Sequence, residues 1–298
     1  MAKRLAAFLG IVVAVVLGAT ALMLGSGADG QGAERVVRTF ALAPGQEIRV
    51  VSWNGPITFE TWDEDVVEIE ARTEPTGIAR SLWRLLGGEA TVRFHEDERG
   101  VRAEIEATRG MLGRASLDVS FRVRVPHEWT GTVSLTTSNG RILAAGLSGQ
   151  ATLKTSNGTI SVKGVNGALD ARTSNGAIDV ADVHGQLTAV TSNGAVHVLG
   201  GTLSGTGRVQ TSNGAIELRT GLAPAASYDI TTSNGSVTAR LLSPNVALDL
   251  NTFNGDIRLE TEVTVSAVDS RRLVGRIGAA DALLKIRTTN GSIVLGTL

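Results

Sequence analysis

The chain has 298 residues, 42% of them hydrophobic, which is enough apolar material for one or two domains with a buried core. Its 28 basic and 29 acidic residues give a net charge of −1, and neither half is strongly basic, so nucleic acid is not expected as a partner. The absence of cysteine excludes disulfides, thiolate nucleophiles and thiolate metal sites, but it leaves the cellular compartment open.

Residues 1–24 have the composition of a membrane segment. Lys3 and Arg4 precede an uncharged, mostly aliphatic run of 20 residues, which is long enough to cross a bilayer. Hydrophobic residues continue beyond the small residues at positions 19–21, so we favour an uncleaved anchor over a cleaved signal peptide. The positive-inside rule then predicts a single-pass protein of the cell membrane whose bulk lies outside the cytoplasm, or a secreted protein if the segment is cleaved. Residues 25–34 are rich in glycine and predict a flexible linker.

Residues 35–130 are expected to form a β-rich N-terminal cap. This segment contains all four tryptophans and most of the phenylalanines of the chain. Residues 78–86 predict a short amphipathic helix. A strand-rich, aromatic segment of this kind is suited to covering the open edge of a following sheet. Alternation of apolar and polar residues predicts strands in RTFAL, EIRVVSW, PITFETW, VVEIEART, TVRFHE, VRAEIEA and LDVSFRVRV.

Residues 131–298 form an array built on the phrase Thr-Ser-Asn-Gly. The phrase or a near-copy recurs in steps of 18, 18, 18, 20, 21, 20 and 36 residues, and the last step suggests that one copy has decayed. A short, nearly fixed period is typical of stacked repeats. An outlying copy stands 85 residues before the array, at Asn54. The asparagines of the array are Asn139, Asn157, Asn175, Asn193, Asn213, Asn234, Asn254 and Asn290.

Three positions of every repeat are apolar, and they define an inward face. Counted from the asparagine, they stand four places before it, three places after it and five places after it. This spacing by two predicts two short strands per coil, each with one buried side. Each coil also needs a second corner, which is expected at Gly149, Gly167, Gly185 and Gly205.

Two all-β architectures fit these patterns. Asn-Gly between alternating runs is a strong hairpin signal, so an antiparallel meander is one alternative. We favour a β-solenoid, or β-helix, with coils of about 18 residues, because stacking explains why the whole phrase recurs. Asparagines would bond amide to amide along the axis, and threonines would pack methyl on methyl. The last repeat runs to the end of the chain, which predicts an open C-terminal edge available for self-association.

The chain resembles a bacterial envelope family known by the name "putative adhesin". The resemblance is carried by the opening FALAPGQEIRVVSWNGPITFETWDEDVVEIEA, by FRVRVPHEWTGTVSLTTSNGRI and by the TSNGxIxV units. It covers about residues 38–298. The resemblance implies an exported or membrane-tethered β-solenoid, and it implies little about the ligand.

An outward column of side chains, four places after the asparagine, is the sharpest candidate for chemistry. Asp179, His197 and Glu217 stand on three consecutive coils, roughly 5 Å apart. A carbohydrate-cleaving enzyme or a metal site could use carboxylates and an imidazole at this spacing. We favour a solvated strand face, with no catalytic residue, metal or cofactor, because the same column also holds Ser161, Thr238 and Arg258.

The expected decayed corner is the second candidate. The stretch DSRRLVGRIG places Arg271, Arg272 and Arg276 where other coils have Ser-Asn-Gly, and three guanidinium groups could hold a phosphate or carboxylate polymer. We favour an irregular loop that tolerates arginine. The corner asparagines are also expected to be structural, since every coil needs a corner.

The favoured hypothesis is a non-enzymatic, membrane-tethered β-solenoid that acts as an adhesin-like binding or scaffold module of the bacterial cell envelope. Its partners would be the membrane, through the N-terminal segment, and an envelope protein or anionic polymer held by repeated shallow contacts. The first alternative is a carbohydrate-cleaving β-helix enzyme that uses the Asp, His and Glu column. The second is an envelope-stress signalling component, which would need a membrane partner because only about four residues precede the apolar run.

Overall fold

In the computed structural model, the described residues are 27–29, 33–75, 90–107 and 117–298, and every element among them is a β-strand. The membrane segment expected over residues 1–24 and the helix expected over residues 78–86 lie outside the described residues, as does half of the linker expected over residues 25–34. Within the described ranges, no helix is long and apolar enough to cross a membrane.

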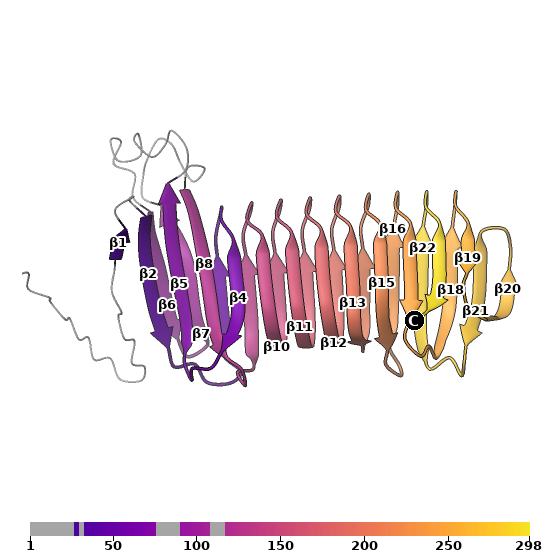
Figure 1. Cartoon of the computed structure of the whole chain (residues 1–298), viewed down its shortest axis with the longest axis horizontal. Coiled ribbons are helices and arrows are strands. Elements are labelled where there is room, and N and C mark those ends of the chain that lie inside the picture. Colours follow the sequence, from indigo (N-terminus) through magenta and orange to yellow (C-terminus); the bar gives the residue numbers. More distant parts are fainter. Residues whose placement is uncertain (1–26, 30–32, 76–89, 108–116) are drawn as a thin grey trace, which may run out of the picture.

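The chain winds into a rod of stacked rungs whose Asn-Gly corners line up along one edge (Figure 1). Each rung has one strand that runs into the corner and one strand that leaves it. Strands of successive rungs in the repeat array pair in parallel and in register, so that Ile160 lies beside Ile178 and Ala171 beside Ala189. This pairing confirms the β-solenoid, and the antiparallel meander is wrong for the array.

Two long sheets result from this stacking, and we name them by their position relative to the corner. The upstream sheet contains, in spatial order, β6 (Ala90–Asp97), β7 (Gly100–Ala107), β3 (Glu47–Val51), β9 (Gly131–Thr136), the second halves of β10 (Ile142–Lys154), β11 (Ile160–Arg172) and β12 (Ile178–Val190), then β14 (Thr206–Gln210), β16 (Ser227–Thr232), β22 (Ala282–Thr288), β18 (Val246–Thr252), β21 (Arg272–Ile277) and β20 (Thr264–Val268). The downstream sheet contains β1 (Gly27–Asp29), β2 (Ala33–Phe40), β5 (Val67–Pro75), β8 (Leu117–Pro126), β4 (Ile57–Trp62), the first halves of β10, β11 and β12, then β13 (Val196–Leu203), β15 (Ile216–Leu222), β17 (Val237–Leu241), β23 (Ile293–Thr297) and β19 (Ile257–Leu259).

At the N-terminal end, the order of the rungs in space differs from their order in the chain. Strands β3 and β4 pair in parallel with β7 and β8 on one side and with β9 and β10 on the other. Two of the strand pairs expected in the cap therefore extend the solenoid. The antiparallel strands β2, β5 and β6 close this end, where the rings of Phe40 and Phe94 lie 5.9 Å apart.

The C-terminal end shows the same exchange of order. Strands β22 and β23, the last in the chain, pair in parallel with β16 and β17 on one side and with β18 and β19 on the other. The last repeat thus lies inside the stack, and the prediction that it forms an open terminal edge is wrong. The prediction of a decayed corner near residue 272 is also wrong, because β20 and β21 form an antiparallel hairpin that covers β18.

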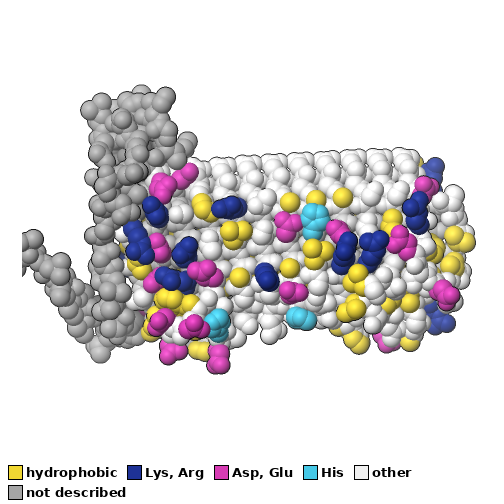
Figure 2. Space-filling view, viewed as in Figure 1, with side chains coloured by type: hydrophobic (Ala, Val, Ile, Leu, Met, Phe, Trp, Pro, Cys, Tyr) yellow, Lys and Arg dark blue, Asp and Glu magenta, His cyan; other side chains and the backbone are white. Residues whose placement is uncertain are grey.

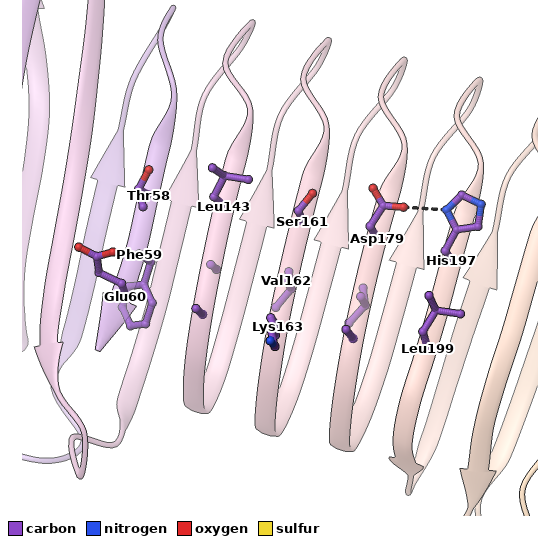
Figure 3. Close-up of a pocket in the computed structure, with 14 residues that line it drawn as sticks. Thr58, Phe59, Glu60, Leu143, Ser161, Val162, Lys163, Asp179, His197 and Leu199 are labelled. Atoms are coloured by element: carbon purple, nitrogen blue, oxygen red, sulfur yellow. Dashed lines mark hydrogen bonds and ion pairs between the residues drawn. The ribbon is translucent and has the colours of Figure 1, made fainter. Parts of the chain in front are cut away.

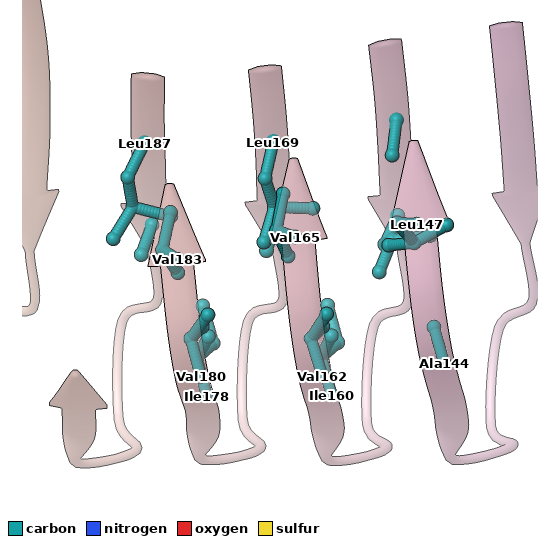
Figure 4. Close-up of a cluster of buried hydrophobic side chains, with 14 of the residues drawn as sticks. Ala144, Leu147, Ile160, Val162, Val165, Leu169, Ile178, Val180, Val183 and Leu187 are labelled. Atoms are coloured by element: carbon teal, nitrogen blue, oxygen red, sulfur yellow. The ribbon is translucent and has the colours of Figure 1, made fainter. Parts of the chain in front are cut away.

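The core lies between the two sheets and consists of the predicted inward columns. Figure 4 shows part of it, where Ile160, Val162 and their counterparts on neighbouring rungs form continuous stacks. Ile160 is 0% exposed and Val162 is 3% exposed. Full burial of such a side chain contributes about 1.5–3 kcal/mol. Ile257 and Leu259 are only partly buried, because β19 is the terminal strand of the downstream sheet.

The second corner requires glycine for two physical reasons. Gly149, Gly167, Gly185 and Gly205, where the sequence predicts the second corner, all have positive φ angles, between 65° and 147°. At Gly185 a Cβ atom would also lie 1.8 Å from the carbonyl oxygen of Gly167 on the preceding rung. A side chain would therefore strain the backbone and separate the rungs.

Candidate functional site

The Asn-Gly corners form an uninterrupted ladder of side-chain amides along one edge of the rod. Each Nδ2 donates to the Oδ1 of the neighbouring asparagine at 2.5 to 2.7 Å. This edge is the even, uncharged ridge along the top of the rod in Figure 2. The amide-to-amide bonding predicted for stacked asparagines is thus present. In spatial order the ladder is Asn54, Asn139, Asn157, Asn175, Asn193, Asn213, Asn234, Asn290 and Asn254.

The threonine and glycine of the phrase hold the ladder from the inside. Thr173 is buried, its Oγ1 donates to the carbonyl oxygen of Gly158 on the preceding rung at 3.0 Å, and the N–H of Gly176 donates to the same Oγ1 at 3.3 Å. A Cβ on Gly176 would lie 1.8 Å from that carbonyl oxygen. The recurrence of threonine thus follows from hydroxyl bonding between rungs. The structure gives no reason for the serine side chain.

Two members of the Asp, His and Glu column come together, and the third does not. The Nδ1 of His197 lies 2.7 Å from the Oδ1 of Asp179 (Figure 3). Glu217 lies beside His197 in register, but its carboxylate accepts a hydrogen bond of 2.6 Å from Arg219 on its own strand. No group of three or more possible metal ligands of the His, Cys, Asp or Glu type occurs among the described residues.

The Asp179 and His197 pair lies on the wall of a hollow of about 500 Å³ on the outer face of the downstream sheet. The hollow crosses five strands of successive rungs, β4, β10, β11, β12 and β13 (Figure 3). It exists because small side chains alternate with long ones along the rod: Ala145 and Ala181 flank Lys163, and Leu199 follows at the end. Leu199 is 41% exposed.

The three candidate arginines are separated, and two of them are individually engaged. The guanidinium of Arg271 lies over the ring of Phe253, 5.0 Å from its centroid, and Arg272 donates to the carboxylate of Asp249 at 3.1 Å. Arg276 lies at the far end of β21, opposite Thr264. Backbone N–H groups of Arg271 and Arg272 donate hydrogen bonds to the carboxylate of Asp269. These bonds fix the turn between β20 and β21, and they hold the pKa of Asp269 below its ordinary value. These arginines therefore form no common site.

A second hollow, of about 470 Å³, lies on the outer face of the upstream sheet. Arg172, Arg208 and Lys285 line it together with Asp229 and several hydroxyl groups. The register Arg208, Asp229, Lys285 runs across β14, β16 and β22. The sequence does not predict this site, because Lys285 lies beside Asp229 only through the inserted position of β22.

The chain is similar to one protein family and to several solved structures. No curated protein matches the chain. Three solved structures described as "putative adhesin" are similar to it: one from Parabacteroides distasonis (12% identity, TM-score 0.41, 88% of this chain and 96% of that one), one from Parabacteroides merdae (11%, 0.38, 88% and 95%) and one from Bacteroides fragilis (10%, 0.36, 88% and 96%). A family model described as Toastrack DUF4097 matches residues 111–295, which include all but the last three residues of the repeat array. The chain therefore belongs to the Toastrack DUF4097 family.

Proposed function

We propose that the chain is a non-enzymatic, adhesin-like binding module of the bacterial cell envelope that holds a linear partner along the outer face of its downstream sheet. The observation that carries the proposal is the hollow that crosses five successive rungs there. Because the rungs repeat about every 4.8 Å, a linear partner lying along the rod meets an equivalent pair of outer positions at every rung. Many shallow contacts of this kind add up by avidity.

The composition of the hollow favours a peptide segment over a sugar chain. Leu143 and Leu199 supply apolar contact, Ser161 supplies a hydroxyl and Lys163 supplies a charge. Phe59 is the aromatic residue of the lining, and it is only 1% exposed, so it offers no ring face to a sugar. An extended peptide can place alternate side chains against these groups.

The geometry of the acidic column supports binding rather than catalysis. Glycoside cleavage requires two carboxyl groups on either side of the scissile bond. Here Asp179 bonds to His197, and Glu217 is turned toward Arg219. The side chains of Asp179 and His197 are 49% and 37% exposed, so water has ready access to both.

The proposal includes export and a membrane tether. Its support is the sequence of residues 1–24, with two basic residues before a long apolar run. The tether would reach the end of the rod that β1 and β2 occupy, and the β20–β21 hairpin would then be distal (Figure 1). Cell fractionation and protease treatment of intact cells test this part separately, since a cytoplasmic, protease-protected rod would contradict it.

Site-specific crosslinking of the full-length protein in intact cells tests the binding face. A photo-reactive residue at Ser161, in the hollow, is expected to crosslink to a defined partner, and L143E and L199E are each expected to reduce that product. The matched control is Thr152, which faces outward on the upstream sheet next to Asp170. Equal crosslinking from both positions, or a Ser161 product unaffected by both leucine variants, would contradict the proposal.

The enzyme alternative has its own test. In the triple variant D179A/H197A/E217A, the photo-reactive residue at Ser161 should still crosslink to the same partner. Purified full-length protein in detergent should release no reducing ends from envelope glycans. Glycan cleavage that the triple variant abolishes would establish the enzyme instead.

A further inference from the structure

The outer face of the upstream sheet carries an excess of positive charge that its own acids do not neutralise. Over the rungs from β10 to β18, with the adjoining β21, its outward positions hold the acids Asp170, Asp229 and Asp249 and the bases Lys154, Arg172, Arg208, Lys285, Arg287, Arg272 and Arg276. Each acid is paired with one arginine: Asp170 with Arg172 at 2.7 Å, Asp229 with Arg287 at 3.3 Å and Asp249 with Arg272 at 3.1 Å. Lys154, Arg208, Lys285 and Arg276 are left without an ion pair among the described residues.

Arg208 and Lys285 are the two of these cations that line the same hollow. They lie on either side of Asp229 in register, on β14 and β22. The carboxylate of Asp229 is already engaged, since it also accepts a hydrogen bond of 3.0 Å from the hydroxyl of Thr231. Asp229 therefore leaves both cations available to an external anion.

We propose that this hollow binds the phosphate groups of a linear phosphate polymer. The lining offers the guanidinium of Arg208, the ammonium of Lys285 and the hydroxyls of Thr188, Thr206 and Ser227. Charge-assisted bonds from arginine and lysine are the strong contacts in phosphate recognition.

The spacing of the cations selects a polymer over a single ion. Arg208 and Lys285 stand two rungs apart on the upstream sheet, so their backbones are roughly 10 Å apart along the rod. Arg172, which is paired with Asp170, stands two rungs before Arg208. A chain of phosphates that lies along the rod meets these cations in turn. This site lies on the opposite sheet from the hollow of the proposed function and does not depend on it.

Titration of purified full-length protein with short-chain inorganic polyphosphate tests the proposal. We expect binding that weakens steeply as salt is raised, because the contacts are ionic. R208Q and K285M are each expected to weaken binding about 10-fold, which corresponds to one charge-assisted contact. D229N is expected to strengthen binding, because it removes the one acid of the hollow. The matched control K163M removes a cation from the downstream sheet and should leave the affinity unchanged.

Two further comparisons make the outcome decisive. Polyglutamate of matched length and charge presents carboxylates, and it should bind at least 10-fold more weakly than polyphosphate. All four altered side chains face solvent, so unchanged thermal unfolding should accompany each variant. Absence of polyphosphate binding, an equal loss in K163M, or equal affinity for polyglutamate would overturn the assignment.

Discussion

The side-chain amide of Asn254 donates a hydrogen bond of 2.7 Å to the Oδ1 of Asn290, which lies 36 positions later in the chain. The amide of Asn290 in turn donates to Asn234, which lies 56 positions earlier. The last repeat is thus inserted between two repeats that are consecutive in sequence. The order of the rungs is exchanged in the same way at the other end of the solenoid. There antiparallel strands cover both sheets of the outermost rung, whereas at the C-terminal end they cover β18 and leave β19 as a terminal strand.

Deletion of residues 282–298 is predicted to destroy the C-terminal end of the rod. It would remove an interior rung with the fully buried Leu284, Ile286, Ile293 and Leu295, and it would leave the neighbouring rungs without partners on both sheets. Limited proteolysis should cut between residues 242 and 281 in the truncated protein and spare that segment in the full chain. A truncated protein that resists cleavage there would show that the last repeat is terminal.

Gly176→Ala is predicted to destabilise the protein by about 3 kcal/mol or more, because the added methyl overlaps the carbonyl oxygen of Gly158 on the preceding rung. The control is Ser174→Ala, in the same corner, where the serine side chain is exposed. That change should stay within about 0.5 kcal/mol of the parent. Urea unfolding measures the free energy of unfolding of both variants. Equal values for the two would mean that the rungs are not packed closely enough at the corner to exclude a methyl group.

Asn175→Asp is predicted to be destabilising in a pH-dependent way. The Nδ2 of Asn175 donates to Asn157 at 2.6 Å, and its Oδ1 accepts from Asn193 at 2.7 Å. A charged aspartate keeps the second bond but places an oxygen against the Oδ1 of Asn157. We expect a loss of about 1–2 kcal/mol at pH 7. Part of this loss should be recovered below about pH 4, where the protonated carboxyl can donate. Asn175→Ala, which has no titratable group, should show no such recovery in unfolding measured across pH.

Tyr228 is predicted to make stability fall at alkaline pH. Burial raises the pKa of its phenol, and the N–H of Leu187, which donates to the phenol oxygen at 3.0 Å, opposes that rise only in part. A folded-state pKa above the unfolded value of about 10 gives stability that is complete below pH 10 and is lost as pH rises through the folded pKa.

Spectroscopy can follow this residue directly, since Tyr228 is the only tyrosine of the chain. Tyrosinate absorbance should appear above pH 10, together with the loss of structure. Tyr228→Phe should remove that alkaline step. The variant should also cost about 1–3 kcal/mol at pH 7, because the Leu187 N–H and the Ser204 carbonyl lose their partner. Ionisation at pH 10 without loss of structure would contradict the burial argument.

The sequence predicted the residues of each rung well because the periodicity is local. A spacing of two residues fixes which side chain faces inward, so Ile178 and Val180 could be assigned to the core from their distance to Asn175. The corner asparagines and the positive φ of Gly167 follow in the same way. Hydroxyl bonding by threonine was not foreseen, because its partner carbonyl belongs to another rung.

The order of the rungs could not be predicted, because all rungs present the same inward columns. The sequence pattern alone fits a stack of Asn254 on Asn234 and a stack of Asn254 on Asn290 equally well. The difference lies in the β20–β21 hairpin, whose arginines looked like a corner but pair with Asp249 and Phe253. The hollow of the upstream sheet depends on the same insertion. The hydrogen bond between Arg219 and Glu217 could have been predicted from the sequence, since the two residues lie two positions apart on the same face of one strand.

Disulfide mapping tests most directly the stacking order at the C-terminal end, on which the hollow of the upstream sheet rests. The chain has no cysteine, so any crosslink comes from the introduced pair. Thr231 pairs in register with Arg287, which pairs on its other side with Asn251. Adjacent strands lie about 5 Å apart, within disulfide reach, whereas Thr231 and Asn251 are separated by two steps, roughly 10 Å. The account predicts rapid oxidation of T231C/R287C and none of T231C/N251C. Crosslinking of T231C/N251C in place of T231C/R287C would contradict it.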